Sequence, residues 1–282
     1  MPGRPFVAML GIAMSLALVA PAAAAPTPQP AGAVTAPPDG PARAWLVADL
    51  DTGQILGSRE PYSAHAPAST IKPLLAMVVL DQLAPNAAIR ATAANTQVEC
   101  SCVGLVPGQM YTARQLLDGL LLVSGNDAAN LLADMLGGQL AAVQKMNAKA
   151  YQLGARSTRA GSPSGLDGPG WESVTTPHDL ALIYREALRY PLFVQIVHQT
   201  SAQFPDRSGY REIKNQDRLL RSYAGFIGGK SGYTDLARET YVGMAQRGGH
   251  RLIVVEMYGD DDLWNQAAQL LDWGFSHYPG VS

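Results

Sequence analysis

Strand-like segments lie near both ends of the folded part of the chain, and helix-like segments lie between them. Short apolar runs bounded by turn residues predict five strands, over residues 44–50, 54–57, 229–234, 239–247 and 251–258. Two pairs of these strands are joined by short turns, Asp51-Thr52-Gly53 and Gly248-Gly249, which are typical of hairpins. The pattern therefore predicts one antiparallel sheet made from both ends of the chain.

Helices are predicted in the middle of the chain and at its C-terminal end. Long apolar or helix-periodic segments predict them over residues 71–83, 116–123, 128–136, 141–153, 177–190 and 263–275. Thr112 and Gln115 fit a capping box, and Thr176 before Pro177 fits an N-cap followed by proline in the first helical position. The predicted fold class is α/β, of the α+β kind: a five-stranded antiparallel sheet flanked by helices, with an inserted helical subdomain over about residues 104–195.

The first 25 residues carry the features of a secretory signal. Arg4 precedes an apolar run over residues 6–20, and Ala23 and Ala25 supply the small-x-small pattern of a signal-peptidase site. The run is shorter than the ~20 residues that span a bilayer. We therefore expect residues 1–25 to be a cleaved signal peptide, with an uncleaved signal anchor as the alternative.

Residues 26–42 are expected to be a linker that lies outside the fold. They are rich in proline, alanine and glycine and lack apolar periodicity, which favours an extended, solvated segment. Residues 43–282 are then expected to form a single domain. A secretory signal places that domain outside the cytoplasm, in the periplasm or the cell wall.

Composition and charge exclude several classes of protein. Hydrophobic residues make up 47% of the chain and charged residues 16%, which argues against a disordered chain and against a polytopic membrane protein. The net charge of −2 gives no indication of nucleic-acid binding. Cys100 and Cys102 are too few for a disulfide-built scaffold, although a bridge between them is possible in an oxidising compartment. The histidines show no metal-ligand spacing, so we expect no metal and no cofactor.

Three short motifs carry candidate chemistry. In Ser69-Thr70-Ile71-Lys72 the hydroxyl and the amine are three residues apart, which places both on one face of a helix start, as a serine nucleophile and its base require. Ser124-Gly125-Asn126 lies between two predicted helices, where its polar groups can point into a cleft. Lys230-Ser231-Gly232 lies on a predicted strand, and its cation and hydroxyl suit a substrate carboxylate.

Each motif by itself has an ordinary structural explanation, as a helix start, a turn or an edge strand protected by lysine. Together, and in this order along the chain, they form the motif set of penicillin-binding proteins and class A β-lactamases. The set therefore predicts one pocket in which a hydroxyl, an amine and an anion receptor meet.

The sequence resembles the serine-type D-alanyl-D-alanine carboxypeptidases of peptidase family S11, which are low-molecular-weight penicillin-binding proteins, over about residues 44–275. Besides the three motifs, the resemblance is carried by the segments AWLVADLDTG, typical of actinobacterial members, PASTIKPLLA, LLLVSGNDAANLLA, PSGLDG, GGKSGYT and LLDWGF. Ser231 stands where the family usually has threonine and keeps the hydroxyl. The resemblance implies a β-lactamase/transpeptidase-like fold. Because only about fifty residues follow Lys230, no stable membrane anchor is expected.

The resemblance also implies a reaction: removal of the terminal D-Ala from peptidoglycan stem pentapeptides, through an acyl-enzyme that β-lactam antibiotics can also form. This activity belongs to cell-wall biosynthesis and remodelling. The implied catalytic residues are Ser69 as nucleophile, Lys72 as its base and Ser124 as proton relay. The implied substrate-binding residues are Asn126, Lys230, Ser231, Gly232 and Tyr233. The N–H groups of Ser69 and Tyr233 would form the oxyanion hole.

Two other functions remain open at the level of the sequence. A class A β-lactamase needs a glutamate within a Glu-x-x-Leu-Asn segment after Ser-Asp-Asn, whereas this chain has Ser-Gly-Asn and no such segment. Glu172 is the only glutamate between Ser124 and Glu186, and Ser-Val-Thr follows it. The second alternative is a non-catalytic muropeptide or β-lactam sensor on the same fold, because a fold alone does not establish turnover.

Overall fold

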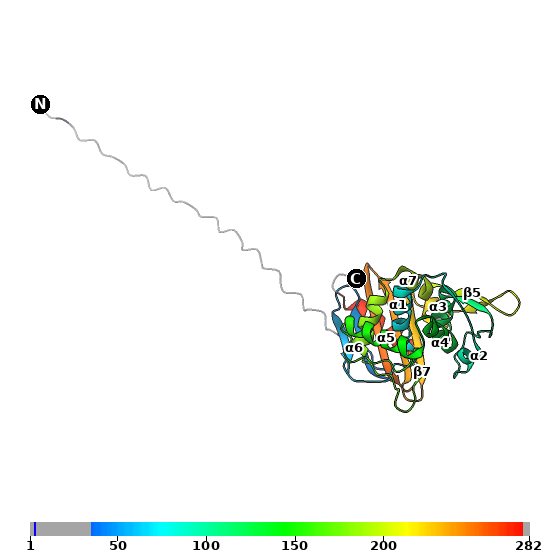
Figure 1. Ribbon diagram of the computed structural model, residues 1–282. Helices are drawn as coiled ribbons and strands as arrows, with labels where there is room; N and C mark the ends of the chain where they lie inside the picture. The colour runs from blue at the N-terminus through cyan, green and yellow to red at the C-terminus, as the bar shows by residue number, and fades with distance from the viewer. Residues whose placement is uncertain (1–2, 4–34, 279–282) are drawn as a thin grey trace. The chain divides into compact units, whose positions relative to one another are not determined.

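The computed structural model describes residue 3 and residues 35–278, and every element below lies within that second range. Five strands form one antiparallel sheet in the order β2-β1-β9-β8-β7 (Figure 1). These strands are β1 (Ala42–Asp49), β2 (Ile55–Arg59), β7 (Phe226–Thr234), β8 (Arg238–Arg247) and β9 (His250–Gly259). Val47 of β1 pairs with Val254 of β9, so strands from the two ends of the chain meet in the sheet. The five-stranded antiparallel sheet predicted from the sequence is confirmed.

The fold begins earlier than the sequence predicts. Ala42, placed at the end of the linker, is the first residue of β1, is fully buried, and donates its N–H to Gln266 Oε1 over 2.9 Å. Asp39 forms an ion pair with Arg59 of β2 over 2.7 Å. The linker assignment is therefore wrong at its C-terminal end, because the groups that hold this segment lie far away in the sequence. Except for Gly3, the expected signal peptide lies outside the described residues, as does the linker up to residue 34.

The helices lie in the middle of the chain and at its C-terminal end, as predicted. They are η1 (Ala68–Ile71), α1 (Lys72–Gln82), α2 (Ala93–Thr96), α3 (Ala113–Leu122), α4 (Asn126–Met135), α5 (Gln139–Gln152), α6 (Pro177–Ala187), α7 (Pro191–His198), α8 (Leu219–Ser222) and α9 (Trp264–Ser276). Among the described residues no helix is long and apolar enough to cross a membrane.

Some elements differ from the prediction. The helix expected over residues 177–190 ends at Ala187, and a separate helix, α7, begins at Pro191. Proline ends one helix here and also begins the next, because its missing N–H is no loss in a first turn. Two small antiparallel sheets of two strands each were not predicted, formed by β3 (Ala88–Arg90) with β4 (Met110–Thr112) and by β5 (Ser201–Pro205) with β6 (Tyr210–Lys214).

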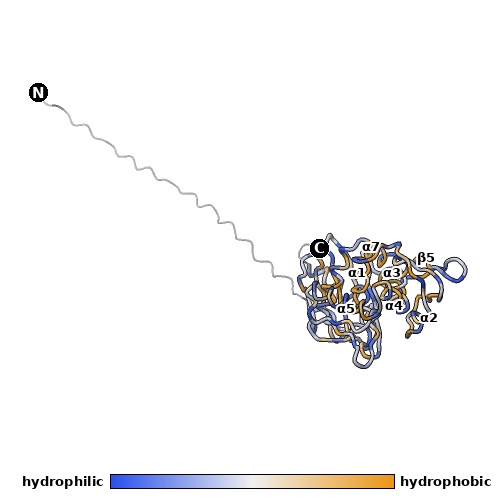
Figure 2. Tube along the Cα trace, in the orientation of Figure 1, coloured by the Kyte–Doolittle hydropathy of each residue, from blue (hydrophilic) through white to orange (hydrophobic). Residues whose placement is uncertain are grey.

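Two hydrophobic clusters pack on opposite faces of the large sheet. On one face, α6 lies against β1 and β9 and α1 packs beside α6, and together they bury residues such as Leu74, Met77 and Ile183 (Figure 1). On the other face, α9 covers the sheet with residues such as Leu270 and Phe275. Figure 2 shows hydrophobic residues along α1, α3 and α4 and hydrophilic ones in the peripheral loops. The apolar segments read from the sequence are therefore the segments that build the core.

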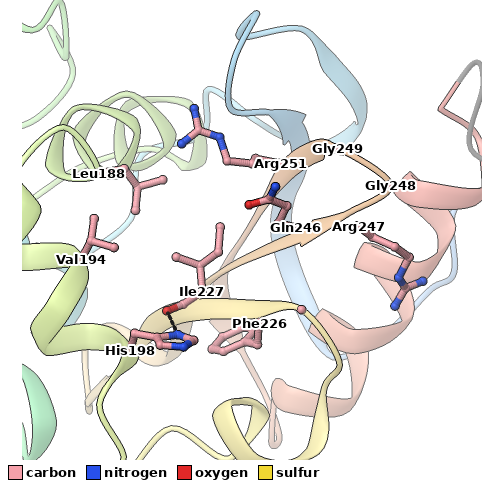
Figure 3. Close-up of a pocket in the computed structure, with 11 residues that line it drawn as sticks. Leu188, Val194, His198, Phe226, Ile227, Gln246, Arg247, Gly248, Gly249 and Arg251 are labelled. Atoms are coloured by element: carbon pink, nitrogen blue, oxygen red, sulfur yellow. Dashed lines mark hydrogen bonds between the residues drawn. The ribbon is translucent and has the colours of Figure 1, made fainter.

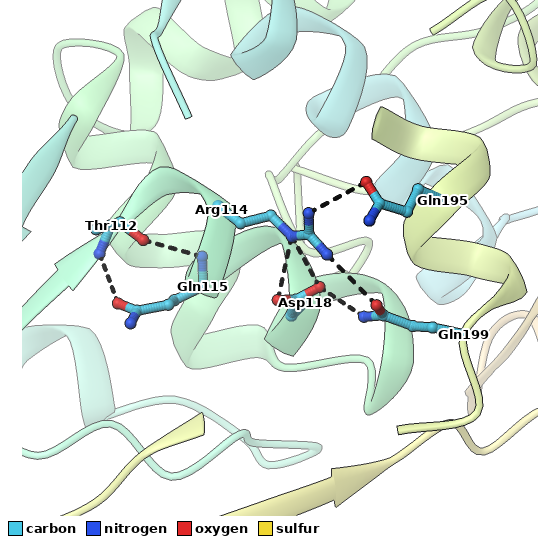
Figure 4. Close-up of polar contacts among 6 residues, drawn as sticks. All are labelled: Thr112, Arg114, Gln115, Asp118, Gln195 and Gln199. Carbon is cyan, nitrogen blue, oxygen red and sulfur yellow. Dashed lines mark hydrogen bonds and ion pairs between the residues drawn. The ribbon is translucent and has the colours of Figure 1, made fainter. Parts of the chain in front are cut away.

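A polar cluster fixes α3, whose C-terminal end leads into the second motif. The predicted capping box is present, since Gln115 N–H donates to Thr112 Oγ1 and Thr112 N–H donates to Gln115 Oε1 (Figure 4). Further along α3, the buried Asp118 carboxylate accepts hydrogen bonds from Arg114 at 3.2 Å and from Gln199 Nε2 at 2.7 Å. Because Gln199 follows α7 directly, these contacts tie α3 to α7 and fix the direction of the loop after α3.

A buried carboxyl group makes the sheet sensitive to pH. Glu256 of β9 lies opposite Trp45 and Tyr241 and is fully buried, and neither carboxylate oxygen has a hydrogen-bond partner in the described part of the chain. Burial, assisted by the negative charge of Asp262, raises the pKa of Glu256 well above its ordinary value of 4.5. The native state therefore keeps a proton that the unfolded state releases.

We predict that Glu256→Gln flattens the pH dependence of stability. In the wild type this group lowers the free energy of unfolding by about 1.4 kcal/mol per pH unit, from the unfolded pKa near 4.5 up to the raised native pKa. Urea unfolding between pH 4 and pH 8 measures the slope. The matched variant Glu212→Gln, at an exposed glutamate of β6, should keep the wild-type slope. Equal slopes for Glu256→Gln and the wild type would contradict a proton held at Glu256.

Candidate active site

The first motif forms a tight turn that joins directly onto a buried helix. Ser69 lies in η1, and Lys72 is the first residue of α1. Lys72 Nζ donates a hydrogen bond to Ser69 Oγ over 2.6 Å, so the three-residue spacing brings the amine onto the hydroxyl. Pro73 in the first turn of α1 loses no hydrogen bond there, because the first N–H groups of a helix have no partner within it.

The turn is held from outside by a glycine loop. Ala68 has a φ of +48°, a left-handed conformation that side chains other than glycine rarely adopt. A Cβ added to Gly165 would collide with the Ala68 carbonyl oxygen, so the loop over residues 163–168 packs directly on the turn Ala68–Ile71, which is called the nucleophile turn below. Such local strain persists only where surrounding structure determines it, which is common at functional sites.

Lys72 connects the first two motifs. It is fully buried, and its Nζ also donates to Ser124 Oγ over 3.3 Å and to Asn126 Oδ1 over 2.7 Å. Burial lowers the pKa of Lys72 well below its usual value, the positive charge of Lys230 lowers it further, and Asp127 opposes the shift. The amine is thus biased toward the neutral form, which can take a proton from a serine hydroxyl.

Asn126 is positioned by a loop that sequence analysis did not connect with it. It begins α4, and its backbone N–H donates to the Ser101 carbonyl over 2.7 Å. Its side-chain Nδ2 donates to the Glu99 carbonyl, also over 2.7 Å. Both ends of the amide are therefore hydrogen-bonded within the protein, and the role of Asn126 toward a substrate stays a prediction.

The third motif lies on β7, which packs against the nucleophile turn. A Cβ added to Gly232 would lie 2.7 Å from the backbone nitrogen of Ser69, so only glycine permits this approach. Lys230 is buried, and its Nζ donates to the Ser231 carbonyl over 2.7 Å. Burial lowers the pKa of Lys230 to about 8, and the negative charge of Asp217 raises it in opposition.

The motif residues meet at one cleft of about 340 Å³. The predicted residues that line it are Ser69, Ser124, Asn126, Ser231, Gly232 and Tyr233. Lys72 and Lys230 are buried close behind its wall, and the positive charge of Lys230 lowers the pKa of Lys72. The arrangement provides a serine hydroxyl with an adjacent amine and a neighbouring cation, which can support acyl transfer from a substrate that carries a carboxylate.

A buried carboxylate that the sequence did not indicate, Asp217, lies beside Lys230. Asp217 accepts the Tyr241 hydroxyl with both oxygens at 3.0 Å and caps Leu219 N–H at 3.0 Å. Burial raises the pKa of Asp217 to about 6, and the hydrogen bond from Tyr241 works against that shift. The residue follows no recognisable motif, so its place next to the strand of Lys230 could be found only from the fold.

Asp167, in the segment PSGLDG, joins two parts of the fold that lie beside Ser69. Its Oδ2 accepts a hydrogen bond from Thr234 Oγ1 over 2.7 Å, which ties the loop over residues 163–168 to the end of β7. The nucleophile turn is thereby enclosed between this loop and the strand. The signal available in the sequence was the segment PSGLDG, whose partner on β7 could not be read from it.

A larger groove of about 710 Å³ lies between α7 and the end of the sheet formed by β7, β8 and β9 (Figure 3). Its lining is mostly apolar, as at Leu188 and Val194, and His198 Nδ1 lies 3.0 Å from the Ile227 carbonyl oxygen. The lining contains no serine, cysteine or carboxylate, so it offers no nucleophile. The smaller cleft at Ser69 is therefore the candidate active site.

Comparisons with known proteins agree with this assignment. The chain matches the family Peptidase_S11, described as D-alanyl-D-alanine carboxypeptidase, over residues 31–261. It is 58% identical to D-alanyl-D-alanine carboxypeptidase DacB2 of Mycobacterium tuberculosis, over 90% of this chain and 89% of the relative. A crystal structure of a D-alanyl-D-alanine carboxypeptidase from M. tuberculosis H37Rv has a TM-score of 0.86 at 58% identity, over 90% of this chain and 98% of that one. The Streptomyces K15 DD-transpeptidase has a TM-score of 0.80 at 30% identity, over 86% and 100% of the two chains.

We predict that acylation of Ser69 by benzylpenicillin, which carries a carboxylate, slows as pH rises through about 8, because Lys230 then loses its proton. Asp217→Asn removes the negative charge that supports the protonated form, so the decline should begin at lower pH. The second-order acylation rate constant between pH 6 and pH 10 measures both effects.

Asp206→Asn, on the hairpin of β5 and β6, is the control and should keep the wild-type profile. If the acylation rate constant of Asp217→Asn declined at the same pH as that of the wild type, Asp217 would not act on Lys230.

Proposed function

The chain belongs to the D-alanyl-D-alanine carboxypeptidases of peptidase family S11, and from that premise we propose that it removes the terminal D-Ala from peptidoglycan stem pentapeptides through an acyl-enzyme on Ser69. One observation carries the mechanism: the buried Lys72 amine contacts Ser69 Oγ at 2.6 Å while burial and Lys230 disfavour its charged form. A serine hydroxyl is a weak nucleophile until an adjacent base removes its proton.

In the acylation step, Lys72 takes the proton of Ser69 as Oγ attacks the carbonyl of the penultimate D-Ala. The developing oxyanion is stabilised by the backbone N–H groups of Ser69 and Tyr233. A Cβ added to Gly232 of β7 would lie only 2.7 Å from Ser69 N, so the backbones of β7 and Ser69 lie close together. This proximity supports the proposal that the N–H groups of Ser69 and Tyr233 act on the same oxyanion. Loss of one such donor typically costs roughly 3–4 kcal/mol of transition-state stabilisation.

Departure of the terminal D-Ala needs a proton on its amine. Ser124 Oγ is 3.3 Å from Lys72 Nζ and lines the cleft, so it can pass the proton from Lys72 to the leaving group. Ser124 has a φ of +61° and lies in the short loop between α3 and α4. Water then hydrolyses the acyl-enzyme and restores Ser69.

Substrate recognition is assigned to the strand side of the cleft. Lys230 and Ser231 bind the terminal carboxylate of the substrate, since a buried cation beside a hydroxyl is a favourable receptor for an anion. Asn126 and Gly232 border the acylated D-Ala. β-Lactams present a similar amide and carboxylate, so they acylate the same serine.

The class A β-lactamase alternative is disfavoured by the comparisons and by the position of Glu172. That carboxylate accepts the Gly170 N–H over 3.1 Å and is not among the residues that line the cleft. A substrate in the bacterial cell wall also supports an extracytoplasmic location, in the periplasm or the cell wall, and a role in cell-wall remodelling.

We predict a single penicillin adduct on the wild-type protein and none on Ser69→Ala, as measured by intact mass spectrometry. Lys72→Ala should slow acylation by about 100- to 10,000-fold, the usual contribution of a general base. The purified protein should release D-Ala from a pentapeptide ending in D-Ala-D-Ala.

The remaining outcomes separate the alternatives. Rapid penicillin turnover would favour a β-lactamase. Binding of the pentapeptide without release of D-Ala would favour a sensor, and full activity in Lys72→Ala would refute the assigned base.

A further inference from the structure

A disulfide bond lies at the wall of the catalytic cleft. It joins Cys100 to Cys102, whose Cα atoms are 4.8 Å apart. Glu99, Cys100 and Ser101 line the cleft together with Ser69, and Cys100 is exposed to solvent. The two cysteines are the only ones in the chain, so this bond is the only disulfide it can form internally.

The bridged loop contacts the first residue of α4 from both sides of Cys100. The Glu99 carbonyl accepts Asn126 Nδ2, and the Ser101 carbonyl accepts the Asn126 backbone N–H, each over 2.7 Å. Asn126 Oδ1 in turn accepts Lys72 Nζ over 2.7 Å. A continuous series of hydrogen bonds therefore runs from the disulfide-closed loop to the amine that activates Ser69.

The C-terminal side of the same loop is held by a different group. The Asp127 carboxylate accepts the backbone N–H groups of Val103, Gly104 and Leu105 at 2.8–2.9 Å. No helix or strand covers residues 97–106. On the N-terminal side of this loop, the disulfide is therefore the covalent bond that constrains the directions of the Glu99 and Ser101 carbonyls, which orient Asn126.

We propose that the Cys100–Cys102 disulfide is a positioning element of the active site, which holds the Glu99 and Ser101 carbonyls so that Asn126 keeps its amide oxygen on Lys72. This inference rests on the proposed acyl-enzyme mechanism. Opening the disulfide frees the backbone between the two cysteines, and Asn126 then loses its fixed orientation. The amine is no longer held on Ser69 Oγ, and acylation slows.

The position of the disulfide makes the enzyme sensitive to dithiol reductants. A thiolate of the dithiol attacks one sulfur and forms a mixed disulfide, releasing the other cysteine as a thiol. The second thiolate of the same reductant displaces the remaining cysteine. The products are two cysteine thiols and the oxidised, cyclised dithiol, a transfer of two electrons and two protons. Exposure of Cys100 gives the reductant access.

The test compares acylation by benzylpenicillin before and after reduction with dithiothreitol. Reduced wild-type protein and the double variant Cys100→Ser/Cys102→Ser should acylate about 10- to 100-fold more slowly than the oxidised wild type, the range expected for a misplaced catalytic group. Dithiothreitol should not change the double variant further. Reoxidation of the wild type should restore the rate.

Asn126→Ala shows whether the effect passes through Asn126. This variant acylates slowly in the oxidised state, and reduction should leave its rate unchanged, because the group that the disulfide positions is already absent. Circular dichroism on the same samples reports folding. Absence of any adduct on oxidised wild-type protein would instead be a failure of the proposed function.

Three results would overturn the positioning role. They are an unchanged rate in reduced wild type, an equal further loss in reduced Asn126→Ala, and a loss of rate that parallels loss of the circular dichroism signal.

Discussion

The candidate site depends on the Lys72 amine, whose charged form is disfavoured by burial inside the protein. An ammonium group removed from water costs several kcal/mol unless it is paired, and no carboxylate contacts Lys72 Nζ within the described chain. The nitrogen is surrounded instead by the oxygens of Ser69, Ser124 and Asn126. In the proposed mechanism this unfavourable burial has a use, because a neutral lysine can act as the base for a serine nucleophile. Three parts of the fold surround the Lys72 amine: the start of α1, the loop between α3 and α4, and β7.

Close backbone packing explains how these walls come together. The nucleophile turn is enclosed between β7 and the loop over residues 163–168, and a side chain at Gly165 or Gly232 would collide with it. The left-handed conformation of Ala68 lies at the same point of contact. Glycines at these two positions allow the strand and the loop to approach the Ser69 backbone, and the hydrogen bond between Thr234 and Asp167 joins the strand to the loop. The geometry of the hydroxyl is therefore determined by contacts on both sides.

Charge balance around the cleft is set by groups that touch the reacting residues only indirectly. Asp217 supports the protonated form of Lys230, and Lys230 in turn disfavours protonation of Lys72. In the proposed mechanism, the buried carboxylate of Asp217 thus helps Lys230 to remain cationic beside a Lys72 amine that acts in its neutral form. The Tyr241 hydroxyl supports this arrangement, because its hydrogen bonds favour the ionised form of Asp217. On the opposite wall, Asp127 fixes the loop that carries the disulfide.

Local patterns in the chain are enough to predict the five strands, the capping box at Thr112 and the three motifs, because periodicity, turn residues and caps need no distant partner. The start of β1 at Ala42, in contrast, depends on packing, since its partner Gln266 is 224 residues away. The fold was likewise needed to find the two small sheets, the pairing of Asp217 with Tyr241, the disulfide beside Asn126 and the burial of Glu256. Each depends on groups brought together by packing, and no spacing along the chain specifies which distant residues will share one buried site.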